Sequence, residues 1–181
     1  PDTQLITGAM GITSGSDHWY DFENMEVTYF RNDLVNKVIP SGSVRTVGNF
    51  FTVFAVESFI DELAHEVNVD PLDLRLSLLK GIGRNEGSSY RDENGNVLRG
   101  SDQVTLGGGK RLANVLKIAA GQSSYGSVTV GSITAHGIAI AAAESRANPT
   151  FSACVAQVTI TAGGNVAVDK LTVCSDVGVA I

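Results

Sequence analysis

Residues 50–79 read FFTVFAVESFIDELAHEVNVDPLDLRLSLL, and this stretch decides the fold class. As far as Val67, its apolar residues recur at spacings of three and four, which predicts a helix with a broad buried face. Asn49 is a candidate cap for the first turn of this helix. Asp70-Pro71 predicts the start of a second helix, because proline loses no hydrogen bond at the first helical position. The apolar positions of the first helix are Phe50, Val53, Phe54, Val56, Ile60, Leu63, Ala64 and Val67.

The last third of the chain has the composition of β-strands. Ser132–Ala143, Ser152–Thr161 and Asn165–Val173 are rich in residues that favour strands, and Gly163-Gly164 predicts a hairpin turn between the last two. Lys110–Ala120, just before them, has the periodicity of a third helix. Strands and helices in separate parts of the chain predict an α+β fold, with helices packed on a largely antiparallel β-sheet. The predicted buried face of the third helix consists of Leu112, Val115, Leu116 and Ala119.

The remaining segments are less regular. Residues 1–23 predict a loop that is docked by its aromatic residues Trp19 and Tyr20, and Asn24–Arg31 and Leu34–Ile39 are two short strand candidates. Residues 81–109 form a glycine-rich excursion, with room for a small hairpin around residues 93–96. We expect residues 1–181 to form one domain, and the absence of a start methionine before Pro1 suggests a piece of a longer polypeptide.

Composition and charge exclude several classes of protein. Hydrophobic residues make up 43% of the 181 residues and charged residues 18%, which excludes a disordered chain and a coiled coil. The net charge is −6 and the basic residues are not clustered, so we expect no nucleic-acid partner. No apolar run reaches the length of a membrane span, and the sequence does not assign a compartment.

The cysteines and histidines give no sign of a metal site. Cys154 and Cys174 fall on the two strands of the predicted hairpin, and we expect two buried free thiols, although a cross-strand contact between them stays open. His18, His65 and His136 lie far apart in the sequence, and each fits a surface or packing role better than the role of a ligand.

Two groups of residues have both a chemical and a structural interpretation. Glu57 and Asp61 are four residues apart on one helical face, as a carboxylate pair for acid–base work would be. Because Arg75 follows on the next predicted helix, we favour a structural ion pair instead. Gly107-Gly108-Gly109 before Lys110 resembles an anion-binding helix start, but it lacks the spacing of a phosphate-binding loop and a preceding strand.

An ordered set of segments resembles one enzyme family. Val44-Arg45-Thr46-Val47-Gly48 leads into the helix with Ile60-Asp61-Glu62-Leu63-Ala64, and Asp70-Pro71 and Arg75-Leu76-Ser77-Leu78-Leu79 follow. This order resembles the molybdopterin-binding large subunits of the xanthine dehydrogenase/aldehyde oxidase family, and most closely the isoquinoline 1-oxidoreductase beta subunits. The resemblance covers roughly residues 20–80 and 110–181, and no single motif is decisive. Its other parts are Asp21-Phe22-Glu23-Asn24, Gly137-Ile138-Ala139, Val155-Ala156-Gln157-Val158 and Cys174-Ser175-Asp176-Val177-Gly178-Val179-Ala180-Ile181.

The sequence also departs from the family. Val44 stands where members usually have a bulky residue, and residues 85–108 have no counterpart. The chain ends at Ile181, before the segment in which the family has its general-base glutamate, and the glycine-rich segments that hold the pterin elsewhere in the subunit are missing.

The resemblance implies a fragment of a molybdenum hydroxylase that oxidises aldehydes or N-heterocycles. It implies molybdopterin cytosine dinucleotide as the cofactor of the parent enzyme, with none expected in the isolated fragment, and an iron–sulfur subunit and the rest of the molybdenum subunit as partners. By resemblance, Arg45 and Gly48 contact the cofactor and Val47 lines the substrate side. By resemblance, Asp176 ends a strand near the lobe that this chain lacks and is a candidate to orient that interface. The alternative is a non-catalytic domain for subunit or partner interaction.

Overall fold

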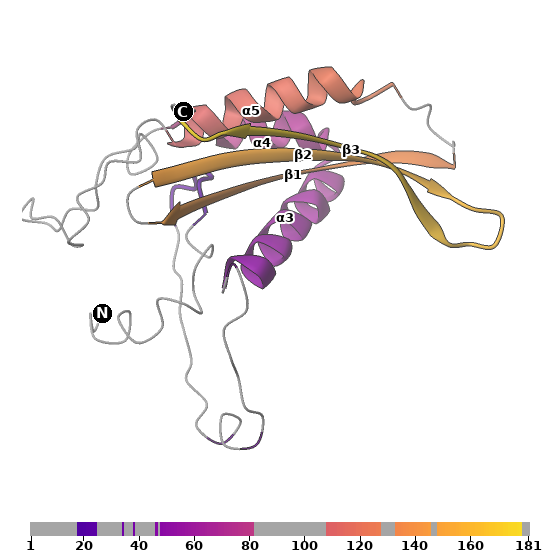
Figure 1. The fold of residues 1–181 in the computed structure, drawn as a ribbon, viewed down its shortest axis with the longest axis horizontal. Helices are drawn as coiled ribbons and strands as arrows, with labels where there is room; N and C mark the ends of the chain where they lie inside the picture. Colours follow the sequence, from indigo (N-terminus) through magenta and orange to yellow (C-terminus); the bar gives the residue numbers. More distant parts are fainter. Residues whose placement is uncertain are drawn as a thin grey trace, which may run out of the picture.

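The computed structural model describes residues 18–24, 34, 38, 46, 48–81, 108–127, 133–145 and 148–178. Over these residues the chain folds as three helices packed on a three-stranded antiparallel sheet, which confirms the predicted α+β class. Figure 1 shows the helix α5 running along the sheet, with α3 and α4 beside it. The elements are α3 (Asn49–Glu66), α4 (Pro71–Leu78), α5 (Gly108–Ser123), β1 (Thr134–Ser145), β2 (Asn148–Ile160) and β3 (Val166–Asp176).

The sheet is a simple meander in the order β1-β2-β3. In its register Ala139 lies opposite Cys154, and Cys154 lies opposite Val173. The hairpin between β2 and β3 turns at Gly163-Gly164 as predicted. There Gly164 has φ +77°, and the Thr161 N–H donates to the Asn165 carbonyl at 2.8 Å. Glycine suits this position because it reaches a positive φ without a steric penalty.

The core lies on one side of the sheet. Successive strand residues point to opposite faces, and the buried set alternates accordingly, with Ile138, Phe151 and Val155 on the face that the helices cover. We call this the helix side. The buried helical residues pack against this set in one cluster: Ile60 of α3 and Leu112, Val115, Leu116, Ala119 and Ala120 of α5. The predicted apolar face of the third helix is therefore confirmed.

The start of α4 follows the sequence signal. Asp70 caps the helix, since its Oδ1 accepts from the Leu72 N–H at 2.8 Å and from the Asp73 N–H at 3.4 Å, and Pro71 is the first helical residue. Such a cap satisfies backbone donors that have no partner within the helix.

The start of α3 differs from the prediction. Gly48, not Asn49, is the N-terminal cap, and it forms no side-chain cap hydrogen bond. The Gly48 carbonyl instead accepts from the backbone N–H and the hydroxyl of Thr52, at 3.0 and 2.7 Å. The broad buried face is also wrong for the first half of α3, where Phe50 and Phe54 are 79% and 74% exposed. Helical spacing puts apolar residues on one face but does not provide an element to cover them.

Two further expectations need correction. Leu34 and Val38 are helical, so they do not belong to a strand there. Leu34, Val35, Val38 and Ile39 are spaced as one helical face, and this spacing competes with the alternation of a strand. Helix α5 begins at Gly108, two residues earlier than expected. The rest of the glycine-rich excursion (82–107), its suggested hairpin and the strand candidate beyond Asn24 lie outside the described residues.

The aromatic residues before α3 dock on the core as the sequence predicts. Tyr20 is buried, and the ring of Trp19 meets the ring of Phe151 edge-on, with 5.6 Å between centroids. Trp19 also lies against the backbone of Gly108, because a Cβ at Gly108 would overlap the atoms of its indole ring. Glycine at the start of α5 therefore makes room for Trp19. In the part of the chain that the structure describes, no helix has the length and hydropathy to cross a membrane.

Candidate functional site

The turn that leads into α3 carries the residues singled out by the resemblance. Arg45 and Val47 lie outside the described residues, whereas Thr46 and Gly48 are described. Thr46 has φ +73°, and its carbonyl accepts from the Asn49 N–H at 3.0 Å. A β-branched residue at positive φ is a genuine outlier, and such outliers cluster at ligand and active sites. Gly48 is buried with φ −66°, an ordinary helical value, so the unusual backbone conformation of the turn belongs to Thr46.

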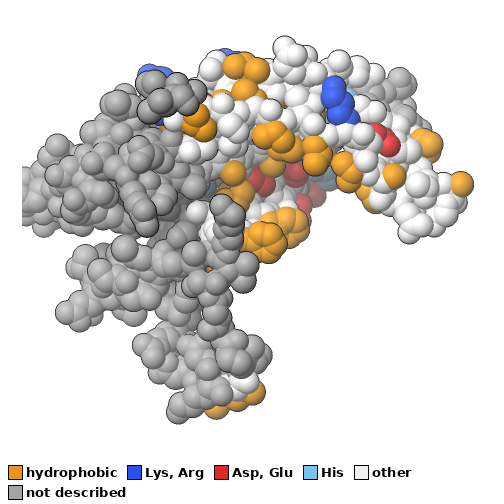
Figure 2. Space-filling view, viewed as in Figure 1, with side chains coloured by type: hydrophobic (Ala, Val, Ile, Leu, Met, Phe, Trp, Pro, Cys, Tyr) orange, Lys and Arg blue, Asp and Glu red, His pale blue; other side chains and the backbone are white. Residues whose placement is uncertain are grey.

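Exposed aromatic side chains follow this turn directly. Phe50, Phe51 and Phe54 are more than half exposed and lie within about one third of the helix circumference. Figure 2 shows hydrophobic side chains gathered where Figure 1 places the first half of α3. A contiguous apolar surface of this kind marks an interaction site more often than a free surface.

The buried polar centre of the domain is built around Arg75. Its Nε donates to Glu57 Oε2 at 3.0 Å, and its Nη1 donates to Asp61 Oδ1 at 2.6 Å. Two backbone carbonyls accept from the same guanidinium, Pro71 O at 3.2 Å and Glu57 O at 3.1 Å. The structural ion pair between the two helices is thereby confirmed, and the alternative of an acid–base carboxylate pair loses its support.

Glu57 also has partners that the sequence did not indicate. The Tyr20 hydroxyl donates to Oε1 at 2.9 Å, and the Ile140 backbone N–H of β1 donates to Oε2 at 3.0 Å. The carboxylate therefore ties the N-terminal loop, α3, α4 and the outer edge of β1 together. Only the prediction that Tyr20 docks on the core could have pointed to it.

The titration behaviour of this centre follows from its burial. Burial raises the pKa of Glu57, and the hydrogen bonds from Arg75, Ile140 and Tyr20 only partly offset this effect. Burial, followed by the charge of Glu57, raises the pKa of Tyr20 far above its ordinary value. Because every polar atom that we name here already has a partner within the domain, the centre acts as a structural clamp.

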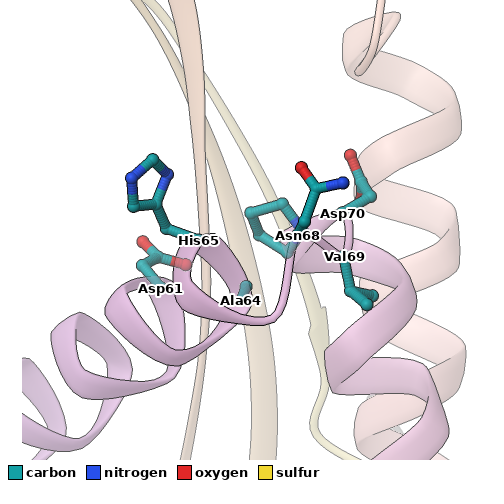
Figure 3. Close-up of a pocket in the computed structure, with 7 residues that line it drawn as sticks. Asp61, Ala64, His65, Asn68, Val69 and Asp70 are labelled. Atoms are coloured by element: carbon teal, nitrogen blue, oxygen red, sulfur yellow. The ribbon is translucent and has the colours of Figure 1, made fainter.

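A hollow of about 310 Å³ lies at the corner between α3 and α4. Figure 3 shows Asp61 and His65 on the last turns of α3 and Asn68 and Asp70 on the connection to α4. Asp61 already bonds to Arg75, and Asp70 caps α4 and accepts from the Tyr125 hydroxyl at 3.4 Å. Within the described ranges no three His, Cys, Asp or Glu side chains come together as a metal site. The two carboxylates of this hollow, Asp61 and Asp70, therefore stabilise the corner itself.

A second ion pair fixes α5 to the end of the sheet. Arg111 Nε donates to Asp176 Oδ2 at 2.7 Å and its Nη2 to Oδ1 at 2.5 Å, and the Gly178 N–H also donates to Oδ1 at 2.9 Å. The guanidinium carbon lies 4.6 Å from the centroid of the Phe151 ring. Asp176 thus joins the last strand to the first turn of α5.

This ion pair gives the domain a predictable dependence on pH. The hydrogen bonds from Arg111 lower the pKa of Asp176 to about 2, compared with about 3.9 for a free aspartate. A lowered folded-state pKa contributes stability that is fully present above the unfolded-state value and is lost as the pH falls toward 2. We expect the Asp176 carboxyl carbon to titrate in NMR spectra with a midpoint of about 2. In Asp176→Asn the free energy of unfolding should depend less on pH between 4 and 2, and an unchanged slope would contradict this.

The two cysteines point to opposite faces of the sheet. Cys174 lies opposite Ala153, a buried residue of the helix side, whereas Cys154 belongs to the other alternating set of β2. Because the side chains point to opposite faces, the cross-strand contact between them does not form. Both thiols are free as expected, but they are half-buried, so the expected burial is wrong.

Comparison with known proteins agrees with the resemblance. Residues 3–78 match the family model of the molybdopterin cofactor-binding domain. The chain is also 36% identical over 169 residues to a protein of Gluconacetobacter polyoxogenes that is named membrane-bound aldehyde dehydrogenase (pyrroloquinoline-quinone). This alignment covers 93% of the chain and 20% of the relative, so the chain spans about a fifth of the relative's length. Residues 3–78 are therefore similar to a molybdopterin cofactor-binding domain, and the chain is similar to part of an aldehyde dehydrogenase.

Proposed function

We propose that this chain forms part of the cofactor and substrate site of a molybdenum hydroxylase large subunit that oxidises aldehydes or N-heterocycles. In this proposal Arg45 and Gly48 contact the cofactor, which is molybdopterin cytosine dinucleotide, and Val47 lines the substrate side. The narrower likeness to isoquinoline 1-oxidoreductases and the iron–sulfur partner subunit are parts of the same proposal.

One observation carries the proposal: the left-handed backbone of Thr46, next to Arg45 and within the segment that matches the molybdopterin-binding family. Such a conformation costs about 1–3 kcal/mol and persists where the surrounding structure enforces it. The exposed phenylalanines after the turn supply a flat apolar surface, and a guanidinium offers a planar set of donors to oxygen atoms. The conformation of Thr46 and the exposed phenylalanines, together with the guanidinium that the sequence supplies at residue 45, support a site for a large cofactor with anionic and aromatic portions.

The comparisons name two different cofactors. The family model that covers the turn names molybdopterin, whereas the printed name of the relative contains pyrroloquinoline-quinone. We favour molybdopterin, because the family model matches residues 3–78 themselves, while about four-fifths of the relative lies outside its alignment with this chain. When bound, the molybdenum cofactor supplies the oxidation of a substrate carbon, and the residues of this chain bind and orient the reactants.

The test uses the native polypeptide that carries this sequence, with Arg45→Ala and Arg45→Lys. A charged hydrogen bond to the cofactor or substrate contributes about 1.5–3 kcal/mol, so we expect Arg45→Ala to lower kcat/KM for an aldehyde about 10- to 100-fold. Arg45→Lys should fall between Arg45→Ala and the wild type, because lysine keeps the charge and loses the planar fork.

Thr46→Gly is the matched control, because glycine keeps Arg45 and adopts a positive φ without a steric penalty. It should retain molybdenum content and activity within about threefold of the wild type, a margin below 1 kcal/mol. Wild-type kcat/KM together with a wild-type molybdenum content in Arg45→Ala would remove Arg45 from the site. Purified protein that contains pyrroloquinoline-quinone and no molybdenum would overturn the proposed cofactor.

A second function, subunit or partner interaction without catalysis, is favoured by the exposed face of α3. Phe50 and Phe54 are too exposed to contribute to the core of this domain. Phe50→Ser and Phe54→Ser test this second function. If they weaken subunit assembly while molybdenum content and kcat/KM stay unchanged, the exposed face of α3 serves subunit or partner interaction.

A further inference from the structure

The sheet has a second face that no described element covers. Counted in register, one row across the three strands consists of Gly137, Ala156 and Leu171, and the next row consists of Ala139, Cys154 and Val173. These residues alternate with the buried residues of the helix side, so they share the opposite face. We call the two rows and their neighbours on this face the open face.

The open face has the composition of a protein interior. Leu171 and Val173 are 60% and 63% exposed, and neither row contains a charged residue. An antiparallel sheet with one face in water normally places polar residues on that face. Figure 2 shows hydrophobic side chains along the part of the molecule where Figure 1 places β2 and β3. An apolar surface of this extent is expected to be covered in the functional protein.

Two charged residues of β3, Lys170 and Asp176, do not lie on the open face. Lys170 lies opposite Gln157 and Asp176 lies opposite Phe151, so both belong to the alternating set of the helix side. Asp176 bonds to Arg111 of α5 on that side. The strand therefore places Asp176, which pairs with Arg111, on the helix side and places Leu171 and Val173 on the open face, the reverse of a strand whose second face is solvated.

The polar side chains of the next row pair with each other. Ser152 and Ser175 lie directly opposite each other on β2 and β3, and their hydroxyl oxygens are 2.8 Å apart, within hydrogen-bond distance. In this single hydrogen bond one hydroxyl donates and the other accepts, so removing the pair from water would leave only the proton of the accepting hydroxyl without a partner. The open face can therefore become dry at little cost.

We propose that the open face is an internal packing surface, covered by an aliphatic layer from the remainder of the same longer polypeptide. The relative that matches 93% of this chain is about five times as long as the match, so its chain supplies ample structure for such a layer. The missing or small side chains of Gly137, Ala139 and Ala156 allow a close approach, and Leu171 and Val173 project into the covering layer. The inference rests on the proposed function only for the existence of the longer polypeptide.

The test measures thiol protection in the native polypeptide that carries this sequence. Val173→Cys is the main probe, because this position is largely exposed unless another segment covers it. Asn165→Cys, in the exposed turn of the same hairpin, is the matched control. We expect iodoacetamide to modify Val173→Cys at least 100-fold more slowly than Asn165→Cys, and peptide mass spectrometry distinguishes these thiols from Cys154 and Cys174. Leu171→Cys is a second probe should Val173→Cys not fold.

Each outcome decides the proposal. Protection of the probe thiol that stays the same across a wide range of protein concentration supports cover from the same chain. A reaction rate within threefold of the Asn165→Cys rate means that the face is open and overturns the proposal. Protection that is lost on dilution, together with a dimer in light scattering, assigns the face to a second copy and also overturns it. Molybdenum content of the same samples is a separate readout, so a failure of the cofactor proposal would show itself independently of thiol protection.

Discussion

Replacing Arg75 with alanine is expected to lower the free energy of unfolding of the 181-residue chain by about 3–5 kcal/mol, the usual loss when one partner of a buried ion pair is removed. Arg75 is fully buried, and its side chain bonds to Glu57, to Asp61 and to two backbone carbonyls. Alanine would leave the Glu57 carboxylate buried beside β1 with only neutral donors. Urea unfolding followed by circular dichroism measures the loss.

The controls separate the charge from the packing. Arg111→Ala removes a partly exposed ion pair and should cost only about 1 kcal/mol. Glu57→Gln combined with Arg75→Ala should destabilise the chain by less than the sum of the two single changes, because the uncompensated charge is then absent. A loss below about 1 kcal/mol for Arg75→Ala would contradict the assignment of Arg75 as the centre of the domain, since a disrupted buried network costs several times as much.

The local sequence signals predicted the elements well. Proline after a capping aspartate set the start of α4, and two glycines set the hairpin turn between β2 and β3. The ion pair of Arg75 with the carboxylates of α3 was also predictable, because helical periodicity placed them on facing helices. In these cases the interactions that fix the local structure join residues a few positions apart in the sequence, or residues of two adjacent helices.

The long-range features could not be predicted in the same way. Apolar spacing along α3 indicated which residues share a face, but burial depends on other elements, and these cover Ile60 and Ala64 and leave Phe50 exposed. The bond from the Ile140 N–H to Glu57 joins residues 83 positions apart and has no sequence signature. The left-handed conformation of Thr46 was equally hidden, because threonine rarely adopts it. For the candidate site, the resemblance supplied the residue names and the structure supplied the backbone outlier.

Replacing Phe151 with alanine tests whether the sheet, the N-terminal loop and α5 form one cooperative core. Phe151 is fully buried, and its ring contacts Trp19 at its edge and lies beneath the Arg111 guanidinium. The change removes this packing and leaves a cavity that β2 cannot close, so we expect a loss of about 3–5 kcal/mol in the free energy of unfolding.

Phe54→Ala is the matched control, because Phe54 is 74% exposed on α3 and the same truncation there should change the free energy of unfolding by less than about 0.5 kcal/mol. Trp19 fluorescence should report the same unfolding midpoint as circular dichroism in the wild type, and both midpoints should shift together in Phe151→Ala. If Trp19 is released at a lower urea concentration than the helices unfold, the N-terminal loop is a separate unit. The clamp at Glu57 would then join two parts of the domain that unfold independently, although Tyr20 and Arg75 bond to the same carboxylate.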